Sequence, residues 1–154
     1  MAATEFIAQD PAYAARVRAS FDRQRMMQTL GAALTQVAPG RVVIELAWAE
    51  ALTQQHGFLH AGAVGAALDS ACGYAGFSLM AVDAAVLTIE YKLNLLAPAQ
   101  GQRFRMEGQV VKPGRTITVT EGRAFALDAD RREKLIATMG CTLMAVVGRP
   151  DIHH

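Results

Sequence analysis

The pattern of apolar and polar residues changes along the chain, from helical spacing in the first half to alternation in the second. Apolar residues recur at roughly helical spacing between Asp10-Pro11, which can begin a helix, and Gly31, which can end one. A second helix is expected from His60 to about Met80, where apolar and small residues cover nearly every side. The first half therefore predicts an N-terminal helix and a long helix that is buried all round.

Strands are expected before and after the long helix. Residues 86–95 alternate between apolar and polar side chains with a period of two, so one face of this strand should be buried and the other polar. A turn at Pro39-Gly40 precedes the first strand, and a bulge is expected at Gly122. The predicted strands are residues 42–48, 86–95, 104–112, 116–127 and 135–147.

A helix that is apolar on nearly all sides needs apolar cover on nearly all sides, and a curved antiparallel sheet wrapped around it supplies that cover. Small residues along the helix, many of them alanine and glycine, let the sheet approach closely. The sequence thus predicts the α+β class and the hotdog fold, in which a curved antiparallel β-sheet surrounds a long central α-helix, here with an N-terminal helix. One domain is expected over residues 1–154, with its core at about residues 21–147.

The composition narrows the possible functions. Of 154 residues, 52% are hydrophobic and 19% are charged, and the formal net charge of +1 leaves no large field to hold nucleic acid or an anionic membrane. Cys72 and Cys141 are too few for a disulfide framework or a four-cysteine zinc site, and no metal-ligand spacing is found. We therefore expect no metal, nucleic-acid or membrane partner, and a cytoplasmic protein with both thiols buried.

Asp69 stands in the least polar segment of the chain, AGAVGAALDSACGYAG. A buried, unpaired carboxylate is unfavourable by several kcal/mol, so it needs hydrogen-bond partners, a raised pKa or contact with solvent. An aspartate that is bonded to backbone groups or faces a subunit interface for packing reasons fits this pattern, and so does a catalytic carboxylate.

His60, Ala61 and Gly62 stand where the long helix should begin, and the free N–H groups and positive dipole of a helix start suit a developing oxyanion. His60 could equally bond its own loop, whereas Gly62 would let a substrate approach the backbone. Asp69 lies about 10–12 Å along the axis from the first turn, too far to act on a carbonyl held there by its own chain. A second copy packed antiparallel could bring the two together, so we expect a homodimer with shared sites, in which dimers could pair further into tetramers.

Other polar residues carry weaker indications. Ser70 and Ser78 lack the Gly-x-Ser-x-Gly pattern of serine hydrolases, and Cys72 is better explained as a core residue than as a nucleophile. The turn from Lys112 to Arg115 places two positive charges together. Such a turn is usually solvated, but it would suit the phosphates of a ligand.

The segments TQQHGFLHAGAVGAALDSACGYA and TIEYKLNLLAPAQG resemble hotdog-fold acyl-CoA thioesterases of the phenylacetate-degradation (PaaI-type) group, over about residues 21–147. The family's helix-entry motif, usually His-Gly-Gly, is His60-Ala61-Gly62 here. The family's acid, nine positions after that histidine, matches Asp69, and its amide, fifteen positions before the acid, matches Gln54. The chain departs from the family at Ala61, which still offers an N–H, and at Gly73, where related enzymes often have threonine or serine.

The resemblance implies hydrolysis of an acyl-CoA with a medium-chain, long-chain or aryl acyl group, without a cofactor, because CoA is part of the substrate. It implies that the Ala61 or Gly62 N–H polarises the thioester carbonyl, assisted by Gln54, and that His60 orients the carbonyl or the loop. Asp69 of the partner chain would act as general base or nucleophile. CoA-contacting residues would be Thr88, Asn94, Lys112, Arg115 and Arg123. Acyl-pocket residues would be Phe58, Leu59, Tyr74, Phe77 and Met80.

Two other functions stay open at this stage. A hydratase or dehydratase of acyl thioesters would use His60 and the Asp69 of a second chain as an acid–base pair. A sensor would bind acyl-CoA without turning it over, although no helix-turn-helix or basic extension that could link it to DNA accompanies the domain.

Overall fold

The computed structural model describes residues 5–152. The helices are α1 (Tyr13–Arg23), α2 (Arg25–Thr29) and α3 (Ala61–Phe77), with a short 3-10 helix at Glu50–Leu52. The strands are β1 (Ala33–Ala38), β2 (Arg41–Ala47), β3 (Ala85–Leu95), β4 (Arg103–Lys112), β5 (Ile117–Leu127) and β6 (Glu133–Val146).

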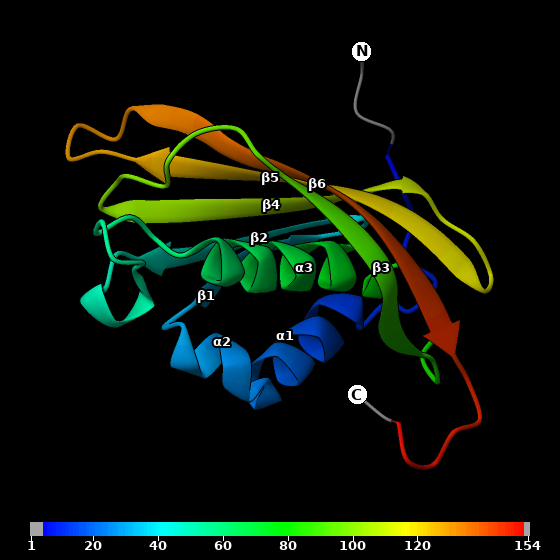
Figure 1. Ribbon diagram of the computed structural model, residues 1–154. Coiled ribbons are helices and arrows are strands. Elements are labelled where there is room, and N and C mark those ends of the chain that lie inside the picture. The colour runs from blue at the N-terminus through cyan, green and yellow to red at the C-terminus, as the bar shows by residue number, and fades with distance from the viewer. Residues whose placement is uncertain (1–4, 153–154) are drawn as a thin grey trace.

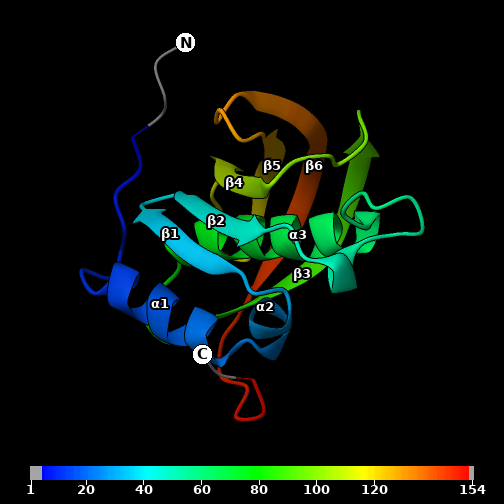
Figure 2. The same ribbon diagram turned by 90° about the vertical axis from the view of Figure 1, so that its left-hand side faces the viewer.

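The six strands form one antiparallel sheet in the order β1-β2-β4-β5-β6-β3. The sheet curves over one side of α3, while α1 and α2 lie on the side of α3 that faces away from it (Figures 1 and 2). The rings of Phe21 on α1 and Tyr74 on α3 pack edge to face with centroids 5.9 Å apart. A curved sheet around a buried central helix confirms the predicted hotdog fold.

Within the described residues, the first predicted helix is two helices. Gln24 interrupts it in an extended conformation, with φ −80° and ψ 99°, and α2 ends just before Gly31 at φ +62°. Regular helix begins at Tyr13. Just before it, the carboxylate of Asp10 accepts a hydrogen bond from the N–H of Ala12 at 2.8 Å. The sequence therefore predicted correctly where this helical region begins and ends, but it did not predict the break at Gln24.

Two details of the sheet also differ from the prediction. β1 was not predicted, because its sequence ALTQVA alternates only weakly and its pairing with β2 is irregular between Leu34 and Gln36. No bulge occurs at Gly122, where the pairing is regular on both sides; the irregularity of β5 against β6 lies between Ala124 and Phe125.

Glycines of the sheet let α3 lie close to it. A Cβ atom at Gly108 of β4 would overlap the backbone of Ala71 and Cys72 in α3. A Cβ atom at Gly122 of β5 would lie 2.9 Å from Cys72 Sγ and from Leu68 Cγ. The glycine at position 122 thus serves close helix–sheet packing instead of a bulge.

Arg16 of α1 caps the C-terminal end of α3, which has no basic residue in its own last turn. Its guanidinium donates to the carbonyls of Met80 at 2.9 Å and Ala81 at 3.0 Å and lies 4.3 Å from the Phe77 ring centroid. The buried carboxylate of Asp10 pairs with Arg16 at 3.0 Å. These carbonyls belong to the turn that follows α3, so the contact fixes α1 against the C-terminal end of the helix.

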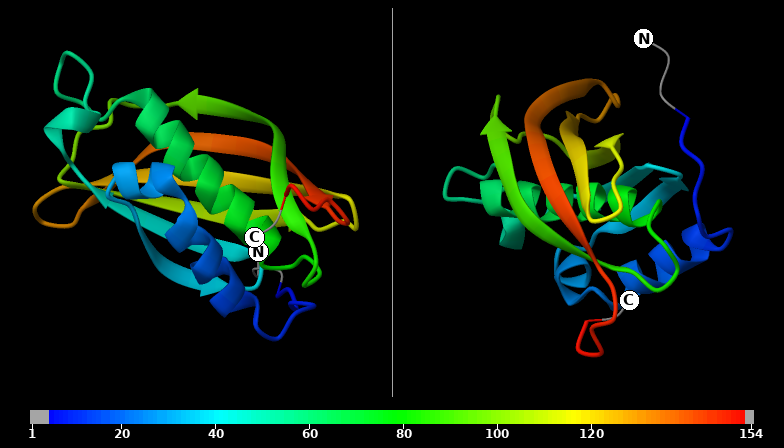
Figure 3. Two further views of the ribbon diagram at one scale, coloured as in Figure 1. Left: turned by 90° about the horizontal axis from the view of Figure 1, so that it is seen from below. Right: turned by 90° about the vertical axis from the view of Figure 1, so that its right-hand side faces the viewer.

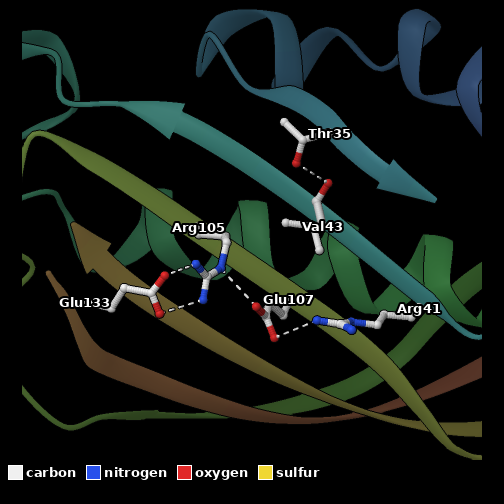
Figure 4. A network of polar contacts seen from close by, with 6 residues as sticks. All are labelled: Thr35, Arg41, Val43, Arg105, Glu107 and Glu133. Atoms are coloured by element: carbon white, nitrogen blue, oxygen red, sulfur yellow. Dashed lines mark hydrogen bonds and ion pairs between the residues drawn. The ribbon is translucent and has the colours of Figure 1, made fainter. Parts of the chain in front are cut away.

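The outer face of the sheet carries a network of ion pairs (Figure 4). Arg105 of β4 lies over the Phe125 ring of β5, donates to Glu133 of β6 at 2.9 Å, and pairs with Glu107 at 2.9 Å. Arg41 of β2 lies 3.5 Å from Glu107. The network links strands that are not neighbours.

No helix within residues 5–152 is long and apolar enough to cross a membrane.

Gly108→Ala should destabilise the protein by about 2–3 kcal/mol, because the new methyl group meets backbone atoms of α3 that cannot move independently. Gly140→Ala is the matched control, since a Cβ atom at this β6 position meets no atom within 4 Å. Urea unfolding followed by circular dichroism measures both variants. Equal stabilities of the two variants would contradict the close-packing role of Gly108.

Candidate active site

The start of α3 offers one backbone donor to a ligand. His60 is the N-cap, and its ring Nδ1 accepts the N–H of Gly62 at 2.8 Å. The His60 carbonyl accepts the N–H groups of Ala63 and Val64. Among residues 5–152, no acceptor is found for the Ala61 N–H. Of the two amides that the sequence suggested for an oxyanion, Gly62 is therefore occupied and Ala61 is available.

Gln54 is held beside this helix start by its own loop. Its backbone N–H donates to Phe58 at 2.9 Å, its carbonyl accepts from Gly57 at 3.0 Å, and its side-chain oxygen accepts the His56 N–H. The side-chain NH₂ of Gln54 makes no hydrogen bond to a described residue. This amide can donate to a carbonyl oxygen that also reaches Ala61.

A mainly apolar cavity of about 520 Å³ opens at the helix start. Its lining residues are Gln54, Phe58, Leu59, Ala61, Val64, Leu95, Leu96, Ala97, Pro98, Ala99 and Ile136. Phe58 and Leu59, two of the predicted acyl-pocket residues, line this cavity.

The other three predicted acyl-pocket residues lie elsewhere. Tyr74, Phe77 and Met80 are buried towards the far end of α3, where Tyr74 packs against Phe21 and Phe77 lies under Arg16. Tyr74 also lines a small cavity with Asp69, and Met80 lines a cavity with Arg115.

Asp69 lies two turns into α3 and is half-buried. Its Oδ1 accepts the hydroxyl of Thr88 on β3 at 2.9 Å and lies 3.9 Å from the thiol of Cys141 on β6. Burial raises the pKa of Asp69 above its ordinary value of 3.8, and the hydrogen bonds from Thr88 and Cys141 oppose that rise. A carboxylate with a raised pKa and incomplete burial is suited to accept a proton from water.

A small cavity of about 90 Å³ lies beside the Asp69 carboxylate. Its lining residues are Gln24, Asp69, Ser70, Gly73, Tyr74, Val86 and Thr88. It shares no lining residue with the cavity at Ala61. Within one protomer, the carboxylate and the free amide therefore serve two separate cavities, about 12 Å apart along the helix axis at 1.5 Å per residue.

The predicted CoA-contacting residues are spread over the molecule. Thr88 is bonded to Asp69, and the Asn94 amide is exposed near the end of β3, 3.5 Å from the Thr138 hydroxyl. Lys112 and Arg115 flank the β4–β5 turn, and Arg115 lines a cavity with Met80 at the other end of α3. Arg123 is exposed on β5.

Thr88 and Cys141 are the partners of Asp69 that sequence reasoning did not assign. Thr88 was expected at CoA, and Cys141 was expected only to be buried. The available signal was the polar face of the strand at residues 86–95, but it does not show which helix residue that face meets. Cys72, next to Cys141, is fully buried, and hydrogen bonding to Cys141 together with burial raises the pKa of its thiol, which agrees with a core role.

Comparison with solved structures finds proteins of similar fold. A thioesterase family protein from Silicibacter pomeroyi is 57% identical, with a TM-score of 0.86 over 88% of this chain and 99% of that chain. The PaaI protein from the phenylacetic acid degradation operon of Escherichia coli has a TM-score of 0.77 over 88% of this chain and 94% of its own, at 17% identity. The second likeness concerns the fold alone.

Sequence comparison points the same way. The thioesterase superfamily model matches residues 56–132. A Saccharolobus solfataricus protein named as an esterase is 36% identical over 83 residues, which are 53% of this chain and 58% of that relative. The 1,4-dihydroxy-2-naphthoyl-CoA hydrolase of Listeria monocytogenes is 25% identical over 77% of this chain and 93% of its own.

The chain therefore belongs to the thioesterase superfamily, the class of enzyme that hydrolyses thioester bonds. This confirms the resemblance seen in the sequence. The match spans only a little over half of the Saccharolobus relative.

Asp69→Asn should raise the free energy of unfolding at pH 7. Because the pKa of Asp69 is higher in the folded than in the unfolded chain, the penalty for its buried charge is absent below about pH 3.8 and grows as the pH rises through the folded-state pKa. Asparagine removes the charge and can still accept the Thr88 hydroxyl. The gain should therefore shrink as the pH falls towards 3.8.

Urea unfolding at several pH values measures this difference. Asp83→Asn, at an exposed position between α3 and β3, is the control and should change stability little at any pH. A loss of stability in Asp69→Asn at pH 7 would show that the carboxylate stabilises the fold, contrary to this account.

Proposed function

We propose that the protein hydrolyses acyl-CoA thioesters at a site built by two copies of the chain. The observation that carries this proposal is the separation of two complementary half-sites in one protomer. The Ala61 N–H and the Gln54 amide can hold a carbonyl at an apolar cavity, whereas Asp69 can activate water at another cavity. An antiparallel partner would place Asp69 of one copy at Ala61 of the other.

The thioester carbonyl oxygen accepts hydrogen bonds from the Ala61 N–H and the Gln54 amide. The positive end of the α3 dipole adds to this stabilisation as negative charge develops on the oxygen. His60 takes part indirectly, because its ring holds Gly62 and so defines the first turn of the helix. The acyl chain, medium, long or aryl, lies in the apolar cavity against Phe58 and Leu59.

Asp69 of the partner supplies the second half of the reaction. As a general base it takes a proton from water while the water oxygen bonds to the carbonyl carbon; the C–S bond then breaks and the CoA thiolate takes up a proton. As a nucleophile the carboxylate instead forms an anhydride, which water hydrolyses. Thr88 orients the carboxylate in either route.

The edge of the sheet at β3 supports pairing of two copies. β3 is the last strand of the sheet, with β6 on one side and no strand of residues 5–152 on the other (Figure 3, right). Four of its apolar side chains are between 42% and 57% exposed: Leu87, Ile89, Tyr91 and Leu95. An uncovered apolar edge of this kind is suited to self-association, and Thr88 and Asp69 lie beside it.

CoA is proposed as the thiol because one sequence relative is named as a CoA hydrolase. The pantetheine arm would follow β3 near Asn94. The phosphates would meet Lys112, Arg115 or Arg123, which make no ion pair with a described residue and are exposed.

Hydration is the weaker alternative. A hydratase needs a histidine and a carboxylate as an acid–base pair, but His60 accepts the Gly62 N–H through Nδ1 and so acts as a helix cap. Release of free thiol from acyl-CoA distinguishes hydrolysis from hydration and from mere binding.

Ala61→Pro should lower kcat by about 10²–10³ fold, because it removes a single oxyanion donor. Proline is favoured at the first position of a helix, and His60 before it has φ −62° and ψ 138°, which a following proline tolerates. The fold should therefore be unchanged. Release of thiol from a panel of acyl-CoA esters measures the effect.

Ala61→Gly, which keeps the N–H, is the matched control and should retain most of the activity. Full activity of Ala61→Pro would exclude the helix start as the oxyanion site.

Asp69→Ala should lower kcat by about 10² fold or more, because the variant lacks the carboxylate that accepts a proton from water.

A further inference from the structure

The break between α1 and α2 places a carboxamide next to Asp69. Gln24, the extended residue at the break, turns its side chain to α3, where its Oε1 accepts the Ser70 hydroxyl at 2.9 Å. Ser70 is buried and follows Asp69 directly in sequence. The interruption of a helix that the sequence predicts as continuous thus brings a polar group to the candidate catalytic carboxylate.

The cavity that Gln24 and Asp69 share is small and has several polar groups in its lining. At about 90 Å³ it is much smaller than the cavity of about 520 Å³ at the helix start, but it has room for water. Gly73, one turn beyond Asp69, keeps it open, because a Cβ atom there would meet no atom within 4 Å. Polar cavities of this size hold water when they offer two or more hydrogen-bond partners.

The hydrogen bonds among the lining residues determine which donors and acceptors stay free to bind such a water. The Ser70 hydroxyl fixes the Gln24 amide by donating to its oxygen, and the Gln24 NH₂ group donates to no described residue. The Thr88 hydroxyl donates to Asp69 and keeps its lone pairs. A water in the cavity can therefore accept from Gln24 and donate to Asp69 or Thr88.

We propose that Gln24 is a positioning residue, which holds the hydrolytic water against Asp69 from within the same protomer. The inference rests on the proposed function and selects between its two routes. The water donates one proton to the Asp69 carboxylate, its oxygen bonds to the thioester carbon presented by the partner, and the C–S bond breaks to release the thiolate. Asp69 then returns its proton to the thiolate and forms no bond to the acyl group.

Two variants test the role of Gln24. Gln24→Leu removes the donor to the water and should lower kcat about tenfold or more, the effect of one lost hydrogen bond, while KM stays within twofold, because the groups that bind the thioester are on the partner. Gly73→Leu fills the cavity with a good helix-forming residue and should give the same pattern. Gln28→Leu, which removes an exposed α2 glutamine bonded to Asp22, is the control and should change neither constant.

The outcomes separate this inference from the proposed function. Failure of the wild-type protein to release thiol from any acyl-CoA would overturn the proposed function itself. An active wild type with unchanged kcat in Gln24→Leu and in Gly73→Leu would overturn the role of Gln24 alone. An equal rise of KM in Gln24→Leu and in Gly73→Leu would also overturn the role of Gln24, because it would indicate that the cavity binds the acyl group.

Turnover in ¹⁸O-labelled water provides a second readout that does not depend on folding of a variant. Mass spectrometry of the peptide that contains Asp69 should find no label after many turnovers, since water attacks the thioester directly. Label in Asp69 would show hydrolysis of an anhydride at the aspartyl carbon and would overturn the proposed positioning of water.

Discussion

The structure depends on how one carboxylate is accommodated in a helix that is otherwise apolar. Asp69 loses part of its hydration when the sheet closes over α3, and the only side-chain hydrogen bonds it receives within residues 5–152 come from Thr88 and Cys141. These bonds offset part of the desolvation and leave the pKa raised. The fold therefore keeps a group that destabilises it at neutral pH, which is typical of a residue retained for its chemistry.

The surrounding packing holds this carboxylate at a defined place. Gly108 and Gly122 bring the sheet into contact with the middle of α3, and Arg16 holds the end of the helix. The start of the helix is defined separately, by His60. Because α3 is held at both ends and along its length, the free amide at Ala61 and the carboxylate of Asp69 keep a constant separation. That separation is what requires a second copy to complete the site.

The sequence was sufficient to predict the long helix, the place where it begins, the hotdog sheet and the acid within the helix. These features depend on local spacing and on one unusual residue, Asp69, in an apolar segment. The features it could not provide depend on contacts between distant segments. At the helix break, the Gln24 side chain accepts a hydrogen bond from Ser70, a partner 46 positions away. Likewise, the contact of Tyr74 with Phe21 of α1 joins segments 53 positions apart.

The central claim is that each active site takes its oxyanion donor from one copy and its carboxylate from the other. Mixing the inactive variants Ala61→Pro and Asp69→Ala, under conditions that let subunits exchange, tests it directly. A heterodimer would contain one site with both groups intact, so random exchange should restore about a quarter of the wild-type rate of thiol release. Failure to recover any activity, with exchange of subunits verified by mass spectrometry, would contradict a site shared between two chains.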